Sequence, residues 1–467
     1  MATATQTQTT ESLDQTHASP AAGALVHHPN QSQELIQTSQ RRDAGALSQQ
    51  PRPQSAVVYQ PPTHEEKPGE KREAQFLPWY TRWGYSISLG AAQGFLKPAS
   101  LVRDMQDSIR SSHQASLIKT YQCRPKLPVR VFYPTPYDKE KPRQMPLCFT
   151  IHGGGFIMGT PQDNEAWNAK FASRYSSTVV ALNYNKAPKT TFPMSIHDVE
   201  ALILATLSDP EIAPHIDRSR IAVGGWDAGG NLALTVSQLP AIRPIVNSVF
   251  AFYPPCDFTV THHQKSRLRR YKAGVGGFRA RETDYMLSMS PMIDWSYIPH
   301  GTDLRNPLLS PFYAEHDMLP RRVMIVGCEM DMYAHEAWRT ISKLAGREVP
   351  AMEQTVGREG QSEHGQMLFD DERFHFEQTY NDGSSYKWLL VPDTIHNFDQ
   401  RIGGVVREPD FRADAEHKSE ACLKEIGEWL LGPFHSARTN GTNGTSNLNE
   451  HNGNTNGTAD AHHQIEQ

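Results

Sequence analysis

One segment of the chain, residues 220–232, restricts the choice of fold more than any other. It reads RIAVGGWDAGGNL, so a short apolar run enters a glycine-rich turn, and a helix-like stretch follows at 231–238. Further strands are predicted at 118–123, 129–133, 146–151, 177–183, 245–253, 323–328 and 387–391, and a helix near 195–207. Short β-branched runs that alternate with helical patterns are typical of βαβ units. The sequence therefore predicts an α/β fold with a mostly parallel central sheet, helices on both faces and a helical cap.

Composition divides the chain into a folded middle and two tails. Residues 1–70 contain one aromatic residue, Tyr59, and eleven Gln, and residues 436–467 contain no aromatic residue. Such segments bury too little apolar surface to offset the entropy of ordering, so we expect both to be disordered. One domain over 71–435 remains.

Two parts of this domain are predicted to form the cap, at about 76–115 and 260–307. A polar insertion at about 347–386 is interpreted as a disordered surface loop, with a lid as the alternative. The basic stretch at 265–272 is interpreted as a solvated face of the cap.

Charge and cysteine content limit the classes of partner and compartment. Lys and Arg number 46 against 51 Asp and Glu, and a net charge of −5 argues against nucleic acid or an anionic membrane as an obligatory partner. The five Cys are scattered and form no CxxC pair, which favours a reduced, cytoplasmic setting. We expect no secretory signal, no integral membrane segment, no metal and no cofactor. The sequence leaves the oligomeric state open.

Two glycine-rich turns carry the candidate chemistry. In GWDAG at 225–229, glycine stands two positions on either side of Asp227, as required where a nucleophile sits on a strained turn between a strand and a helix. HGGG at 152–155 follows the predicted strand 146–151 directly, and the N–H groups of its three successive glycines can bind an oxyanion. The first turn lacks the Lys-Ser/Thr of a phosphate loop.

The combination resembles the hormone-sensitive-lipase-like branch of the α/β-hydrolases, the HGGG-type carboxylesterases. Further motifs in the family's order are YNKAP at 184–188, FP at 192–193 with Asp198, LSP at 309–311, GCEMD at 327–331 with Glu336, and IHNF at 395–398. The resemblance implies a catalytic set of Asp227, Asp331 and His396. It also implies an oxyanion hole formed by the N–H groups of Gly154, Gly155 and Ala228.

One departure from the family decides the functional argument. Where the family elbow reads GDSAGG with a nucleophilic Ser, this chain reads GWDAGG, so Asp227 takes the position of the nucleophile. An aspartate is ionised at pH 7 without the help of a base. We expect an enzyme that acts on a small apolar, carbonyl-bearing metabolite (an ester, a lactone or a polyketide-like molecule) in specialised metabolism.

Three alternatives stay open. Asp227 can be a general base for condensation or ring closure, with an enolate in the hole. It can instead attack an sp³ carbon, as in epoxide or halide hydrolysis, or the fold can persist as a silent small-molecule receptor or scaffold. His396 would lie between two carboxylates, which favours imidazolium and therefore proton transfer.

Overall fold

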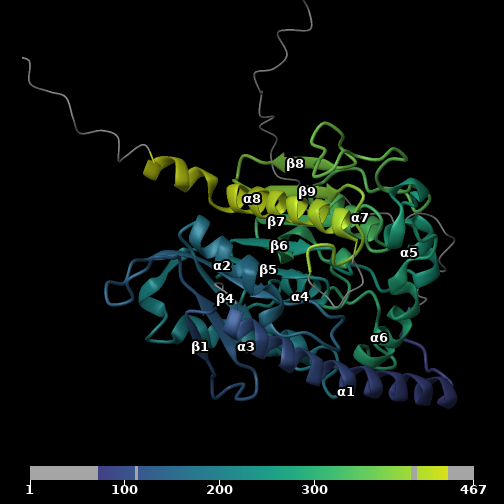
Figure 1. Cartoon of the computed structure of the whole chain (residues 1–467), viewed down its shortest axis with the longest axis horizontal. Helices are drawn as coiled ribbons and strands as arrows, with labels where there is room; N and C mark the ends of the chain where they lie inside the picture. The colour runs from purple at the N-terminus through teal and green to yellow at the C-terminus, as the bar shows by residue number, and fades with distance from the viewer. Residues whose placement is uncertain (1–71, 111–113, 401–407, 440–467) are drawn as a thin grey trace, which may run out of the picture. The chain divides into compact units, whose positions relative to one another are not determined.

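The computed structural model describes residues 72–110, 114–400 and 408–439, with side chains except at 95–110 and 433–439 (Figure 1). The predicted tail 1–70 lies outside the described residues, and so does 436–467 apart from its first four residues, which end the last helix. Within the described ranges, every helix falls short of the length or the apolarity needed to cross a bilayer.

A single sheet runs through the described residues, and it is parallel except at its edges. Its strands are β1 (Leu117–Lys119), β2 (Val129–Phe132), β3 (Met145–Ile151), β4 (Thr178–Leu182), β5 (Ile216–Trp226), β6 (Ser248–Phe252), β7 (Arg322–Cys328), β8 (His375–Thr379) and β9 (Ser385–Val391). Their order in the sheet is β1-β2-β4-β3-β5-β6-β7-β9-β8. The pairs from β4 to β9 are parallel, whereas β1, β2 and β8 pair antiparallel. The mostly parallel sheet expected from the sequence is confirmed.

Both faces of the sheet are covered by helices, so successive strand residues enter two different cores. The helices are α1 (Trp79–Arg110), α2 (Glu165–Arg174), α3 (Met194–Ser208), α4 (Ala228–Val236), α5 (His262–Leu268), α6 (Ser290–Tyr297), α7 (Ala334–Leu344) and α8 (Pro409–Thr439). Side chains of α3, α4 and α7 share one core with Phe149 and Val180. Those of α2 and α8 share the other with Cys148 and Val179. This alternation is why these strands read as continuous apolar runs.

The polar insertion is an ordered part of the domain, so its interpretation as a disordered loop is wrong. It contributes β8, which pairs antiparallel with β9 and extends the sheet by one strand. Val356, Leu368, Phe374 and Phe376 are buried in the first core. These few apolar anchors lie among many Glu, Gln, Gly and Asp, so average composition hid the strand.

The basic stretch at 265–272 is also different from its predicted form, because three of its cations are buried. Lys265 forms an ion pair with Glu336, and Arg269 donates to the carbonyl of Met330. Lys272 is about 1% exposed and donates to Glu329 Oε2 (2.8 Å), Asp393 Oδ1 (2.7 Å) and the Gly360 carbonyl (2.8 Å). The stretch is therefore a buried clamp and not a solvated face.

The Lys272 clamp joins three segments that are distant in sequence. Glu329 belongs to the loop after β7, Asp393 to the loop after β9, and Gly360 to the insertion. The carboxylates also accept backbone N–H groups, from Arg358 to Glu329 and from Ser362 to Asp393. The clamp thus fixes the insertion against the two loops that follow β7 and β9.

We expect Lys272→Met to lower the free energy of unfolding by about 3–5 kcal/mol, because it leaves two buried carboxylates without their cation. The matched control is Lys424→Met, whose exposed pair with Glu428 spans 3.9 Å and should matter by about 0–0.5 kcal/mol. Urea unfolding measures both variants. Equal effects of the two substitutions would show that the clamp contributes nothing.

Candidate active site

The elbow at Asp227 has the strained geometry that its glycines predict. Asp227 follows β5 directly and precedes α4, with φ 51° and ψ −120°. A Cβ at Gly225 would lie 2.2 Å from the Gly229 carbonyl oxygen, and one at Gly229 would lie 2.2 Å from that of Ile151. Side chains are therefore excluded at both glycines, and the turn presents Asp227 at the carboxyl end of the sheet.

The HGGG turn lies against this carboxylate. It follows β3, and Gly154 and Gly155 have φ values of 110° and 56°. Their N–H groups donate to Asp227 Oδ2 at 3.0 and 2.7 Å. The predicted oxyanion hole is thus filled by the protein's own carboxylate. Ala228, the third predicted donor, is fully buried as the first residue of α4.

His396 and Asp331 complete the predicted set. Asp331 lies beyond the end of β7 and His396 beyond the end of β9, and His396 Nδ1 lies 2.8 Å from Asp331 Oδ2. On its other side, His396 Nε2 faces Asp227 Oδ1 at 3.5 Å, a distance typical of an ion pair rather than a tight hydrogen bond. All three side chains are at least 95% buried. The structure therefore brings together residues that are up to 169 positions apart (396 − 227).

The charges of the three groups are mutually dependent. Burial would lower the pKa of the His396 imidazole, but Asp331 and Asp227 outweigh it and hold that pKa well above its usual value. Burial would raise the pKa of the Asp227 carboxyl, but His396 and the N–H groups of Gly155 and Gly154 outweigh it, so that pKa is lowered. These shifts favour an Asp227 carboxylate that faces a His396 imidazolium, and we call this pair the charge array.

Four residues around His396 escaped the sequence analysis because they belong to no motif. Tyr253 and Tyr333 lie edge-on to the imidazole, with ring centroids 4.8 and 5.5 Å away. Tyr285 donates from its hydroxyl to the His396 carbonyl at 3.0 Å. Asp284 accepts the Met332 N–H at 3.0 Å, and burial next to Asp331 raises its pKa to about 6. Tyr285 and Asp284 belong to the segment 260–307, whose contacts no local pattern predicts.

Two neighbours of the site have supporting roles. Trp226 is buried in the second core and donates from Nε1 to Asp399 Oδ2 at 2.9 Å. His152 stacks on Tyr184 and lies 2.7 Å from the Gly153 carbonyl, in keeping with a structural residue at the end of its strand.

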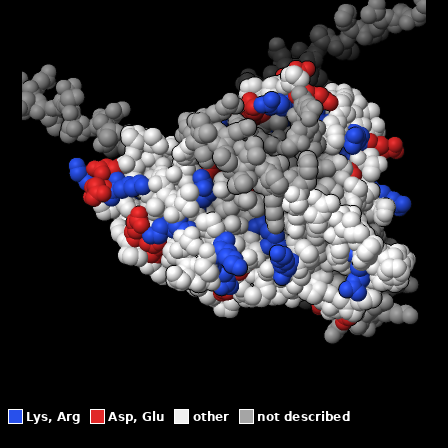
Figure 2. Space-filling view, turned by 60° about the horizontal axis from the view of Figure 1, so that its bottom comes forward, with Lys and Arg blue, Asp and Glu red and all other residues white. Residues whose placement is uncertain are grey.

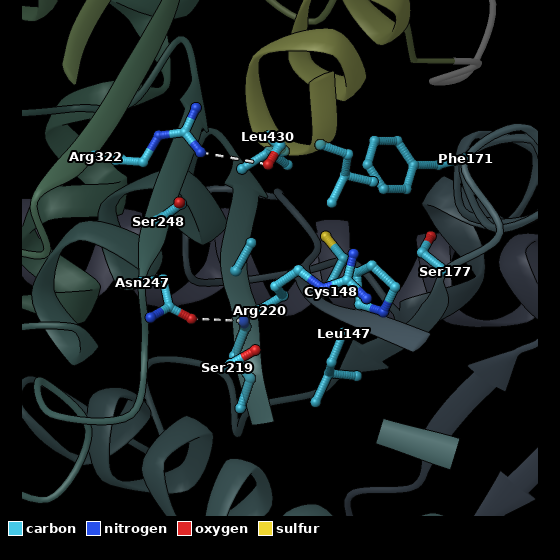
Figure 3. Close-up of a pocket in the computed structure, with 14 residues that line it drawn as sticks. Leu147, Cys148, Phe171, Ser177, Ser219, Arg220, Asn247, Ser248, Arg322 and Leu430 are labelled. Carbon is cyan, nitrogen blue, oxygen red and sulfur yellow. Dashed lines mark hydrogen bonds between the residues drawn. The ribbon is translucent and has the colours of Figure 1, made fainter. Parts of the chain in front are cut away.

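A pocket of about 170 Å³ lies toward the amino-terminal ends of the central strands, away from Asp227 (Figure 3). Its lining includes Ser248 and Arg322, the first residues of β6 and β7, and Ser219–Ala222 in the middle of β5, whereas Asp227 follows the end of β5. Arg322 also donates to the Leu430 carbonyl of α8 in this pocket. The pocket is therefore separate from the candidate site.

Comparison with known proteins assigns the class of fold. Residues 148–364 match the model of a family described as alpha/beta hydrolase fold. The matched range contains the HGGG turn, Asp227 and Asp331 and ends before His396. An esterase from the hyperthermophilic archaeon Pyrobaculum calidifontis superposes with a TM-score of 0.51 at 18% identity, over 76% of this chain and 98% of that chain. The chain has the α/β-hydrolase fold, as its motifs predicted.

Two curated relatives are similar over shorter ranges. An arylesterase from Saccharolobus solfataricus is 28% identical over 204 residues, which are 43% of this chain and 60% of the relative. A non-reducing polyketide synthase, pkbA, from Emericella nidulans is 33% identical over 137 residues, which are 27% of this chain and 5% of that protein. The chain thus matches at most 60% of the length of these relatives.

The charge array makes stability depend on pH in a defined direction. Because the folded-state pKa of His396 exceeds its unfolded value of about 6.5, the array stabilises the fold fully below about pH 6.5 and loses this contribution as pH rises through the folded-state pKa. The excess unfolding free energy of the wild type over Asp227→Asn should therefore shrink as the pH rises above about 6.5 and through the folded-state pKa of His396. Urea unfolding of both proteins across this range measures it. A difference that stays constant or grows would contradict the assigned charges.

Proposed function

We propose that this chain is an enzyme of the hormone-sensitive-lipase-like branch in which Asp227 attacks an electrophilic carbon of a small, mostly apolar molecule. One observation carries the proposal: Asp227 Oδ2 accepts both N–H groups of the hole while Oδ1 faces His396. A carboxylate held in this way has one oxygen stabilised and the other directed at the reacting partners.

The covalent route uses every group of the site. Asp227 Oδ1 forms a bond to a carbon of an epoxide as the carbon–oxygen bond at that carbon breaks. The epoxide oxygen keeps the electron pair of the broken bond and takes a proton from the His396 imidazolium. The neutral imidazole then removes a proton from water, and hydroxide attacks Cγ of the new ester. The negative charge develops on Oδ2, where the N–H groups of Gly154 and Gly155 already lie.

Collapse of this intermediate restores the starting state. The ester Cγ–O bond breaks as the His396 imidazolium donates its proton to the departing alcohol oxygen. The proton of the new carboxylic acid then passes to His396, which restores the imidazolium beside the Asp227 carboxylate. The net reaction adds water to the epoxide. Asp331 orients the imidazole and stabilises its charged form throughout, as in related triads.

The lowered pKa of Asp227 argues against a general base that leaves an enolate in the hole. A carboxylate of low pKa is a weak base, and its own Oδ2 occupies the two N–H groups that the enolate would need. Proton transfer remains the second candidate because the raised pKa of His396 favours an imidazolium that can act as an acid.

The surroundings and the relatives support the substrate class. A Cβ on Gly155 would lie 2.8 Å from Ile293 Cδ1, so an apolar side chain of α6 borders the hole. Tyr253 and Tyr333 lie beside His396. We assign the cap to α1 and the segment 260–307. The relatives named arylesterase and polyketide synthase support an aromatic or polyketide-like metabolite of specialised metabolism. The unpaired cysteines among the described residues suit a cytoplasmic setting.

Mass spectrometry distinguishes the covalent route from the alternatives. In a single turnover of styrene oxide in H₂¹⁸O, we expect the label in the Asp227 carboxylate and not in the diol, because the first product oxygen comes from Oδ1.

His396→Gln should slow turnover by about 10²–10⁴-fold and accumulate enzyme heavier by the mass of one substrate molecule. Asp227→Asn is the control that should stay unmodified. Label found directly in the diol would support Asp227 as a base toward water, and binding without turnover of any epoxide or ester would support a receptor.

Asp227→Ser should create an esterase from the same site. The hydroxyl leaves the hole empty and removes one anion from His396, whose pKa falls so that it can act as a base at pH 7. We expect kcat/KM for p-nitrophenyl butyrate to rise at least about 10²-fold over the wild type. Asp227→Asn should stay inactive. If Asp227→Asn gains as much as Asp227→Ser, or the wild type is already an efficient esterase, the site is assigned wrongly.

A further inference from the structure

The amino-terminal half of α1 has apolar side chains on two opposite faces. Its inner face packs on the domain: Leu89 is buried, Tyr85 contacts the ring of Trp295 at 5.7 Å, and Gln93 Nε2 donates to the carbonyls of Ile157 and Ala187. Its outer face and the residues that lead into it are large, apolar and more than half exposed, namely Phe76, Trp79, Tyr80, Trp83 and Ile87.

Helical geometry makes the outer residues one continuous surface. Trp79, Trp83 and Ile87 are four positions apart and therefore lie on one side of the helix. Gly90 and Gly94 continue this side, and a Cβ on either would meet no described atom within 4 Å. A helix that packs along one face needs only one apolar stripe, so the second stripe is in excess of what the fold requires.

The charge and the residue types of this surface indicate which kind of partner it binds. Residues 74–103 contain no Asp or Glu, although they contain Arg82, Lys97 and Arg103. Trp and Tyr have an apolar ring with one polar group, which suits the boundary between lipid tails and headgroups. Figure 2 turns forward the side that carries α1 in Figure 1, and most of the described surface there is uncharged, with separate Lys and Arg groups and some Asp and Glu among them.

We propose that the outer face of α1, from Trp79 to Gly94 together with Phe76, binds peripherally to a phospholipid surface. The helix lies in the headgroup region, and its aromatic rings enter the edge of the tails. This proposal does not depend on the reaction at Asp227.

The same helix connects the lipid to the candidate site. Gln93 holds the carbonyl of Ile157, two residues after Gly155, and α1 packs against α6, whose Ile293 faces that glycine. The proposed lipid-binding helix thus packs directly on the elements that border the hole.

Vesicle binding by the full chain tests the proposal. Wild-type protein should co-sediment with vesicles of phosphatidylcholine and phosphatidylserine, and less with phosphatidylcholine alone. Brominated phosphatidylcholine should quench its Trp fluorescence, because Trp79 and Trp83 enter the tails. Trp79→Ser with Trp83→Ser should weaken binding at least about tenfold and abolish the quenching.

The matched control is Phe369→Ser, which removes an aromatic side chain of the insertion that is 47% exposed and should leave binding unchanged. Circular dichroism checks that both variants fold. Wild type that stays in solution with both vesicle types, or a double variant that binds as well as wild type, would overturn the proposal. A wild-type dimer by light scattering that the double variant converts to monomer would assign the surface to a second copy of the chain instead.

Discussion

The contact between the Asp227 carboxylate and two backbone N–H groups determines most of what is unusual in this molecule. A buried carboxylate is costly unless it is hydrogen-bonded and paired. Here Gly154 and Gly155 satisfy one oxygen, and the His396 imidazolium faces the other. The protonation of His396 in turn depends on Asp227, so the strained elbow, the glycine turn and the histidine loop form one electrostatic unit.

Sequence predicted the parts of this unit that short motifs encode. Residues at the ends of parallel strands meet at one edge of a sheet, so the order of HGGG, GWDAGG, GCEMD and IHNF sufficed to bring Gly154, Asp227, Asp331 and His396 together. The occupied hole was not predictable, because whether a carboxylate points into or away from the glycines is a matter of one side-chain rotation. Asp284 escaped because its partner Met332 is 48 residues away.

Averages over composition hid two features that single residues reveal. The insertion reads as polar, yet a few buried apolar side chains and the hydrogen bond from Lys272 to the Gly360 carbonyl fix it to the domain. The net charge of −5 describes the whole chain, yet a stretch of thirty residues that contains most of α1 has no acid at all. In both places the local arrangement of charge, rather than its sum, determines what the segment contacts.

The filled hole also determines which covalent reagents for hydrolases fail to react with this protein. Fluorophosphonates and boronic acids capture serine hydrolases because they bond to the serine oxygen and place a charged oxygen in an empty hole. This site has no serine oxygen to which such a reagent could bond. The N–H groups that would bind its charged oxygen already donate to Asp227 Oδ2. The chain would pass unnoticed through a survey of hydrolases based on such reagents, although it retains nearly all of the machinery that they detect.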